Sequence, residues 1–171
     1  WPKILTEMQD QSDILRGYVL PLAAIGPVAS LIGGQVFGYG AFGFSYRPSL
    51  VAALVTALLG FVLSVVAVFV LMLIADLLAP KFAGQSNRLN AFKLVAYSYT
   101  ASWLAGIFGL IPSLGFFSLL GLYSFYLLYT GATPMMKVPQ DKAVGYTVVT
   151  VVCAIVLSIL VAPITALVSG I

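Results

Sequence analysis

The sequence predicts an all-α polytopic membrane protein, a single domain that folds as a bundle of five transmembrane helices. Of the 171 residues, 61% are hydrophobic, whereas a soluble domain is roughly 45–50% apolar. This excess is too large for one small core, so lipid is expected to solvate much of it. Five apolar runs are each long enough to cross the bilayer hydrocarbon, which needs about 20 helical residues. Charged residues form only 8% of the chain and lie mostly between these runs.

The five predicted spans are helical because the hydrocarbon contains no water to satisfy an open backbone. The alternation typical of a membrane β-barrel strand is absent. Prolines in the first and last spans, at Pro21, Pro27 and Pro163, remove backbone donors and are expected to bend those helices. The spans cover about 18–35, 50–75, 91–111, 113–131 and 143–168, and residues 1–17 form a cytoplasmic interfacial segment before them.

The connection between the fourth and fifth spans contains several residues that favour a turn. Gly131 and Pro134 are expected to stop the fourth span. Pro139 suits the turn that follows, and Asp141 then begins the fifth span, where its charge complements the positive end of the helix dipole. The sequence therefore predicts a defined turn between two antiparallel helices.

Lysine and arginine are distributed unevenly between the two sides of the predicted bundle. The N-terminal segment and the second and fourth connections carry seven of the eight, and Arg47 in the first connection is the eighth. Cytoplasmic loops are enriched in these residues, so the N-terminus is expected in the cytoplasm and the C-terminus outside. The net charge of +3 is far from the basic stripe of a nucleic-acid-binding protein, so no nucleic-acid partner is expected.

The N-terminal segment has the apolar period of a helix. Trp1, Ile4, Leu5 and Met8 fall at positions i, i+3, i+4 and i+7, while Lys3 lies on another face. One prediction is a short amphipathic helix at the cytoplasmic membrane interface. The alternative is a packed helix of a larger cytoplasmic domain, and the period alone is compatible with both.

The composition argues against most enzymatic and metal sites. Histidine is absent, and the single cysteine, Cys153, lies in an apolar run, so zinc and iron–sulfur sites lack their usual ligands. A histidine acid or base is excluded, and no span carries a pair of carboxylates or a nucleophile motif. We therefore expect a non-enzymatic protein with no metal and no cofactor.

Polar residues on the third and fourth spans predict a seam between those helices. Lys93, Tyr97 and Thr100 share one face of the third span, and Tyr126 and Tyr129 lie near the end of the fourth. The connection between these spans is very short, so they form an antiparallel hairpin that brings both groups to the same membrane surface. The alternative is an aromatic belt with lysines that extend to the interface.

Several charges are expected at the cytoplasmic interface. Asp76 follows enough apolar residues to lie in the headgroup region rather than at the midplane, where it is either solvated or paired with Lys81. Lys137, Asp141 and Lys142 hold the last connection on the inner side. These residues are candidates for contact with lipid headgroups or with a protein partner.

A stripe of small residues follows one face of the second span. Small side chains let two backbones approach closely, and van der Waals contact drives helix association in lipid. The stripe faces either another span of the same chain or a second copy, and the sequence does not choose between them. Its members are Ala53, Ala57, Gly60, Ser64 and Ala67.

Three segments resemble the bacterial branch of the Yip family, the Ypt/Rab-interacting proteins with a five-span Yip domain: "LAPKFAGQ", "AFKLVAYSYTASWLAGI" and "YLLYTGATPMMKVPQDKAVGYTVV". The resemblance covers essentially the whole chain and implies five helices, a cytoplasmic N-terminus and a location in the bacterial inner membrane. Eukaryotic relatives bind Rab GTPases and associate with one another. The cytoplasmic Asp-Leu-Tyr-Gly-Pro motif of many such relatives is absent here, which argues against GTPase binding.

Two functions are compatible with these patterns. The first is a membrane organiser or scaffold that forms homo-oligomers through the stripe of small residues and recruits other membrane or cytosolic proteins through the basic loops. The alternative is a small transporter, channel or lipid-moving protein, which the polar seam and the prolines in the outer spans favour. Membrane lipids are partners in both cases.

Overall fold

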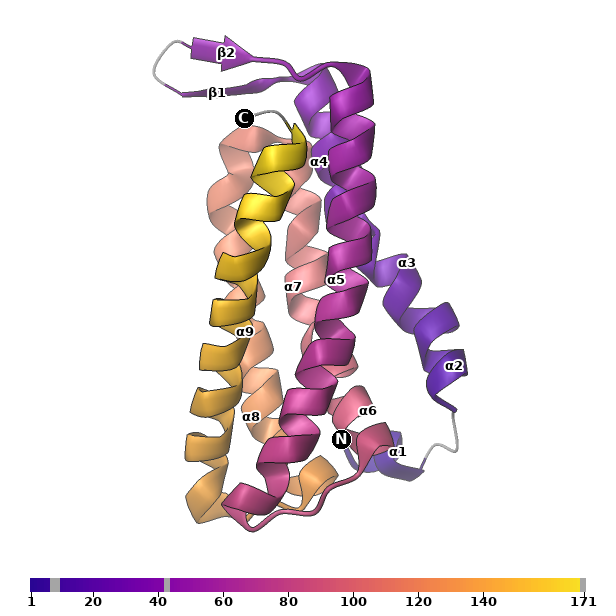
Figure 1. Cartoon of the computed structure of the whole chain (residues 1–171), viewed down its shortest axis with the longest axis vertical. Coiled ribbons are helices and arrows are strands. Elements are labelled where there is room, and N and C mark those ends of the chain that lie inside the picture. Colours follow the sequence, from indigo (N-terminus) through magenta and orange to yellow (C-terminus); the bar gives the residue numbers. More distant parts are fainter. Residues whose placement is uncertain (7–9, 42–43, 170–171) are drawn as a thin grey trace.

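The computed structural model describes residues 1–6, 10–41 and 44–169, which form a bundle of long helices with one short hairpin (Figure 1). In chain order the elements up to the second long helix are α1 (Pro2–Thr6), α2 (Gln11–Ile14), the π-helix η1 (Leu15–Val19), α3 (Leu20–Ala23), α4 (Ile25–Val36), β1 (Tyr39–Ala41), β2 (Phe44–Tyr46) and α5 (Leu50–Leu78). The remaining elements are the 3-10 helix η2 (Ala79–Phe82), α6 (Arg88–Ser98), α7 (Thr100–Ala105), the 3-10 helices η3 (Gly106–Leu110) and η4 (Pro112–Leu122), α8 (Tyr123–Met136) and α9 (Gln140–Ser169).

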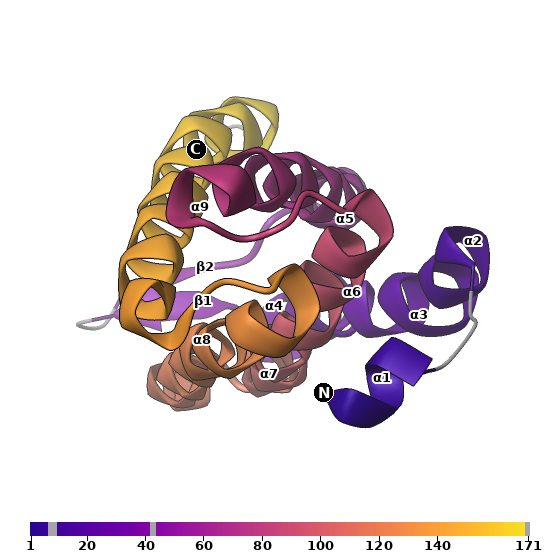
Figure 2. The same cartoon turned by 90° about the horizontal axis from the view of Figure 1, so that it is seen from below.

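The long helices stand side by side, and the hairpin lies at the end opposite the N-terminus. Seen from below, α5 and α9 lie together on one side and α7 and α8 on the other, while α2 and α3 lie at an outer edge (Figure 2). The two strands pair antiparallel, with Tyr39 opposite Tyr46. This hairpin occupies the predicted first connection and is the part of the described chain that departs from a purely helical fold.

Four helical stretches of the described residues are long and apolar enough to cross a membrane. They correspond to the predicted first, second, fourth and fifth spans and comprise Gln11–Val36, Leu50–Phe82, Ser113–Met136 and Gln140–Val161. Many of their outward side chains are apolar and exposed, as Leu58 is with 66% of its surface. Large contiguous apolar surfaces of this kind indicate contact with lipid, so the chain is built as a multi-pass membrane protein.

The predicted third span, 91–111, is divided among α6, α7 and η3 and is not one of these four stretches. Residues 91–96 of α6 are all buried by neighbouring helices, and Lys93 is among them. A turn at Tyr99 separates α6 from α7. The three elements pack along α4, α5 and α8. The count of five spans and the orientation in the membrane stay predictions.

The prolines of the first span coincide with irregular helix. The N–H of Leu20 donates to the carbonyl of Leu15, five residues back, so the turn before Pro21 is a π-turn. Proline has no N–H to donate and its ring crowds the preceding turn, which explains the irregularity at this point. A second break at Ala24 separates α3 from α4, which continues through Pro27.

Close backbone contact joins α4 to η3. A Cβ placed on Gly33 would overlap the carbonyl oxygens of Gly109 and Leu110. One placed on Gly106 would come within 2.8 Å of the Cα of Gly26. Because glycine has no side chain, the first and third predicted spans approach each other here more closely than they could with any other residue at these positions.

The end of α8 differs from the prediction. Gly131 and Pro134 do not stop the helix, which continues to Met136 and ends where Lys137 adopts a left-handed conformation at φ 56°. Gly131 instead makes room for neighbours, because a Cβ there would lie 2.5 Å from Leu94 and 2.6 Å from Trp1. The prediction that Asp141 lies in the first turn of the last helix is confirmed.

Candidate functional site

The predicted polar seam is not assembled as expected. Tyr126 is 55% exposed and its ring contacts Tyr123, so it faces away from the third span. Tyr129 is exposed as well. The buried face of α8 is formed instead by residues one or two positions away, such as Leu128 and Gly131. A periodicity of three places the tyrosines together, but tertiary packing decides which face points inward.

The polar residues of the third span turn toward the N-terminal helices. The ring of Tyr97 lies 4.7 Å from the ring of Tyr18. The hydroxyls of Tyr18 and Thr100 are 2.6 Å apart, and the Thr100 hydroxyl also donates to the carbonyl of Tyr97. Tyr97 and Thr100 therefore belong to a contact with the first predicted span rather than with the fourth.

Lys93 is 3% exposed, and its ammonium donates to the carbonyl oxygen of Ile4 at 3.0 Å. The indole N–H of Trp1 donates to the hydroxyl of Thr130 at 3.1 Å. Trp1, Ile4 and Leu5 also pack against the core. The apolar face of α1 thus packs on the helix bundle itself, which neither of the two alternatives predicted. Met8 lies outside the described residues.

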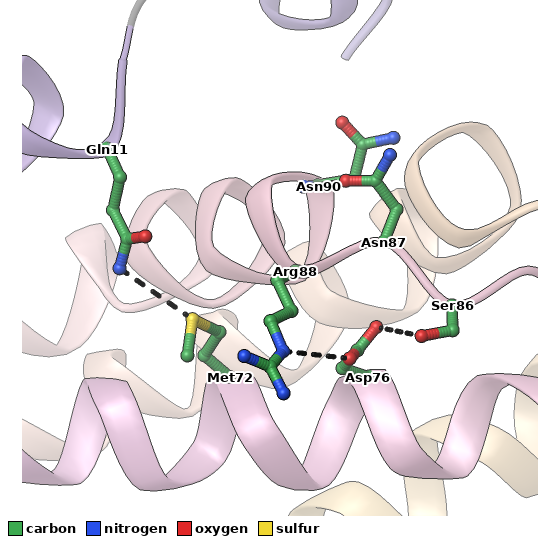
Figure 3. A network of polar contacts seen from close by, with 7 residues as sticks. All are labelled: Gln11, Met72, Asp76, Ser86, Asn87, Arg88 and Asn90. Carbon is green, nitrogen blue, oxygen red and sulfur yellow. Dashed lines mark hydrogen bonds and ion pairs between the residues drawn. The ribbon is translucent and has the colours of Figure 1, made fainter.

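Asp76 is buried, with 6% of its surface exposed. It accepts a hydrogen bond from the Ser86 hydroxyl at 2.8 Å and forms an ion pair with Arg88 at 4.0 Å (Figure 3). We predicted that Asp76 is either solvated or paired with Lys81. Both alternatives are wrong, because the carboxylate is buried and its ion pair is with Arg88. The chain reverses through η2, and the residues that follow it return over the end of α5, which brings Ser86 and Arg88 back to the carboxylate.

The connections at this end of the bundle are held by hydrogen bonds to the ends of helices. The N–H of Gln85 donates to the carbonyl of Met136 at 2.7 Å, and the side chain of Asn90 donates to the carbonyl of Met135 at 3.1 Å. Exposed charges surround this framework. We call the five cations among them the basic end: Lys3, Lys81, Arg88, Lys137 and Lys142. Asp141 is exposed beside them.

The stripe of small residues faces the interior of the bundle. Exposed side chains of α5, such as Leu58 and Val62, lie on the opposite side of the helix from Gly60. Ser64 in the stripe accepts a hydrogen bond from the indole N–H of Trp103 at 3.1 Å. The structure therefore turns the stripe toward helices of the same chain. Apart from its chain neighbours and its own helix backbone, no described atom lies within 4 Å of a Cβ placed on Gly60, so the packing there is loose.

A cavity of about 210 Å³ lies between the third, fourth and fifth predicted spans. Six hydroxyl groups line it together with aliphatic and aromatic side chains. The hydroxyl-bearing residues are Ser98, Tyr99, Ser102, Ser124, Thr150 and Ser158. The other lining residues are Leu71, Val95, Phe125, Leu128, Val151, Ala154 and Ile155. We call this space the hydroxyl-lined cavity.

The break between α6 and α7 builds the polar wall of this cavity. The N–H of Ser102 donates to the Ser124 hydroxyl at 3.0 Å. The two serine hydroxyls lie 2.9 Å apart, and that of Ser102 also donates to the carbonyl of Gly121 at 3.1 Å. The helix of the third span is therefore tied across to the fourth span. Thr150 and Ser158 on α9 donate to carbonyls four residues back in their own helix.

Ser98 is, with Tyr99, one of two lining residues whose hydroxyl has no described hydrogen bond, and it is the more buried of the two. It is 2% exposed, and its Oγ has no hydrogen-bond partner among the described residues. A buried hydroxyl without a partner is destabilising, and native structures contain few of them. The residue therefore offers both a donor and an acceptor toward the cavity that it lines.

The sequence contains a weak signal for this site. Ser98 and Ser102 are four residues apart on one helical face, and Thr150 and Ser158 lie eight apart on another. Uncharged hydroxyls at such spacings are common in helices, so their convergence became visible only in the assembled bundle. Among the described lining residues none carries a formal charge at neutral pH, and no three described His, Cys, Asp or Glu side chains form a metal-binding group.

Comparison with known proteins gives one match. The model of the Yip1 domain family matches residues 1–162, which include the four candidate spans and every residue that lines the cavity. Comparisons with curated proteins and with solved structures found no match. The match extends over nearly the whole chain and thus covers the bundle as one unit.

Proposed function

The chain belongs to the Yip1 domain family of membrane proteins. We propose that it binds a lipid and moves it within the membrane without converting it chemically. The hydroxyl-lined cavity carries this proposal. It reaches the surface of the bundle at α9, where Ile155 is 48% exposed and Ser158 is exposed as well. At that depth of a membrane-embedded bundle the surrounding medium is lipid, so a lipid is the ligand that meets the opening.

The core beyond the cavity supports a lipid rather than an ion as the transported species. Leu94, Met135 and Tyr146 are at most 1% exposed and lie toward the basic end. An ion would need a continuous polar path through this packed region, because charge in an apolar interior is costly. A lipid needs only a cavity with a lateral opening, because the cavity can hold its polar part while its acyl chains stay in the bilayer.

The proposal includes five spans with the basic end in the cytoplasm. In support, the five cations of the basic end lie on elements that meet at one end of the bundle, whereas Arg47 directly follows β2 of the hairpin, which lies at the other end (Figure 1). The elements of the third predicted span run between α4, α5 and α8, and α7 connects through η3 to η4. We place the protein in the bacterial inner membrane, as the resemblance to the bacterial branch implies.

A transbilayer assay tests the proposed movement. The purified chain is reconstituted in phosphatidylcholine liposomes that carry a fluorescent lipid, and loss of the protected inner-leaflet signal is followed after adding an impermeant quencher. Wild type should accelerate movement. Ala154→Phe places a ring in the cavity and should return the rate to that of protein-free liposomes. Val156→Phe adds the same ring to the outer face of α9, where Val156 is exposed, and should leave the rate unchanged.

Either of two results would contradict the proposal: no acceleration by wild type for any lipid of a broad panel, or equal rates for the two phenylalanine variants. Ion flux measured in the same liposomes provides a separate control. An ion conductance that Ala154→Phe removes would favour a channel instead.

A membrane organiser is the second candidate, and the basic end favours it. The cations there are exposed on a framework held by backbone hydrogen bonds, so they form a defined surface for an acidic protein or for anionic lipid headgroups. Reversal of Lys137 and Lys142 to glutamate should abolish salt-sensitive binding of phosphatidylserine vesicles to the reconstituted protein. Retained binding would remove the support for this role.

A further inference from the structure

The lining of the hydroxyl-lined cavity restricts the chemistry of what it holds. Its described side chains offer hydroxyls and apolar groups but no formal charge. A phosphate or another ion enclosed there would have no opposite charge to compensate the loss of water. A neutral group that both donates and accepts hydrogen bonds meets no such penalty, because hydroxyls serve in either role.

Ser98 and Tyr99 are the lining residues whose hydroxyls have unused hydrogen-bond capacity, and Ser98 is the more buried of the two. Ser102 and Ser124 bond to each other, while Thr150 and Ser158 donate to carbonyls of α9. Only the acceptor sides of those hydroxyls remain available to a ligand. Ser98 Oγ, buried and without a described partner, has both its donor and its acceptor capacity left. A ligand hydroxyl or ester carbonyl placed beside it would relieve that deficit.

We propose that the cavity is a binding site for a neutral lipid with a hydroxyl or ester group, such as a diacylglycerol, and that Ser98 is the residue that recognises this group. The inference rests on the proposed function for the location of the site and adds the class of ligand. The polar end of the lipid lies among the hydroxyls, and its acyl chains leave through the opening at Ile155 and Ser158. The volume of about 210 Å³ suits the polar end of such a lipid and not the whole molecule.

Photo-crosslinking tests the class of ligand. The full chain in phosphatidylcholine nanodiscs is exposed to a diacylglycerol with a diazirine in one acyl chain, or to a phosphatidic acid with the same chains. Labelled residues are mapped by mass spectrometry. The diacylglycerol should label α9 around the opening at Ile155 and Ser158, where its acyl chains leave the cavity, and unlabelled dioleoylglycerol should compete. The phosphatidic acid and free glycerol should not compete, because the first carries a charge and the second lacks the acyl chains.

A second measurement uses Ser98→Ala, a variant that leaves the cavity open, unlike Ala154→Phe. It should raise the dioleoylglycerol concentration needed for half-maximal competition about fivefold, the effect of one lost hydrogen bond. The same variant should raise the melting temperature of the lipid-free protein, because it removes a buried hydroxyl without a partner. Ser118→Ala removes an exposed hydroxyl of η4, whose described bond is to the carbonyl of Gly115, and should change neither quantity.

The outcomes separate the two proposals. If both probes label the cavity equally and Ala154→Phe abolishes both signals, the site stands and the neutral class is wrong. Competition by glycerol as strong as that by dioleoylglycerol would show a site for small alcohols and would overturn a lipid ligand. If labelling is spread over the outer faces and insensitive to Ala154→Phe, both the site and the function are wrong. An unchanged competition curve for Ser98→Ala would overturn the role given to Ser98.

Discussion

Three buried polar side chains show how single residues are accommodated in this bundle. Asp76 has a hydroxyl and a guanidinium beside it, and Lys93 donates to a backbone carbonyl. Each of these charges has a polar partner outside its own helix or at the start of the next one, and a buried charge needs such a partner. Ser98 has no described protein partner. Polar residues that support the fold are thus satisfied within it, and the exception lines a cavity.

The ion pair of Asp76 leads to a prediction at the residue scale. Arg88→Met should lower the free energy of unfolding by up to about 1 kcal/mol, because the guanidinium is largely exposed and screened. Lys81→Met removes the same charge from an exposed residue and should change it by less than about 0.5 kcal/mol. Thermal unfolding in detergent, at low salt and at 1 M salt, measures both. An equal loss in both variants would contradict the assignment of Arg88 as partner.

At the scale of elements, glycine has two distinct uses that its position in the sequence does not reveal. Gly33 and Gly106 permit α4 and η3 to touch through their backbones. Gly60 lies on an inward face of α5 with free space around it. The difference arises from the neighbouring helix and not from the residue, so the two positions should respond oppositely to an added methyl group.

Gly33→Ala should destabilise the bundle by about 1–3 kcal/mol, because the methyl group would overlap backbone carbonyls that cannot move independently. Gly60→Ala should be neutral or stabilising by up to about 1 kcal/mol, since alanine has the higher helix propensity and meets no described atom. Unfolding of the two variants in the same detergent measures the contrast. Equal stability of both would show that α4 and η3 do not approach as closely as described.

The orientation of the stripe on α5 is also testable. With Cys153 replaced by alanine, Gly60→Cys should give no disulfide-linked dimer on oxidation in native membranes, because it faces helices of its own chain. Val62→Cys, on the exposed face, reports collisions between copies on the lipid side. A dimer that forms through Gly60→Cys and not through Val62→Cys would indicate that the stripe is open to a second copy.

The whole molecule combines an apolar perimeter with one strongly basic end. Four long helices present exposed apolar side chains, while the cations of the basic end lie on elements that meet at one end. The third predicted span is the most enclosed part, because residues 91–96 are buried by protein on all sides. Its polar residues are tolerated for that reason, although they lower the hydropathy by which a span is recognised.

Cysteine accessibility tests the arrangement in the membrane. In the Cys153→Ala background, Lys142→Cys should react with an impermeant maleimide only after the cytoplasmic side is opened, and Arg47→Cys should react from outside. This result follows from the proposed cytoplasmic position of the basic end. Labelling of both from the same side would imply an even number of crossings between them and would contradict five spans.

Much of the fold could be read from composition and period, and much of the site could not. Apolar run length predicted the four long helices, and the tendency of charges to follow the ends of runs predicted the basic connections. The end of α8 was misassigned because Gly131 serves packing against Trp1 and Leu94. The seam was misassigned because Tyr126 and Tyr129 face outward. A glycine can end a helix or make room for a neighbour, and a tyrosine can face inward or outward. In each case the packing of another element decides which of the two occurs.

Apolar run length and charge placement were enough to predict a helical membrane protein and the positions of its charged connections, because the hydrocarbon imposes length and polarity on each segment separately. Tertiary structure alone decided which side of every helix faces inward, which partner each buried charge has and where hydroxyls from three spans converge around Ser98. Those outcomes depend on how helices rotate and cross one another, and that information belongs to pairs of elements rather than to any single stretch of sequence.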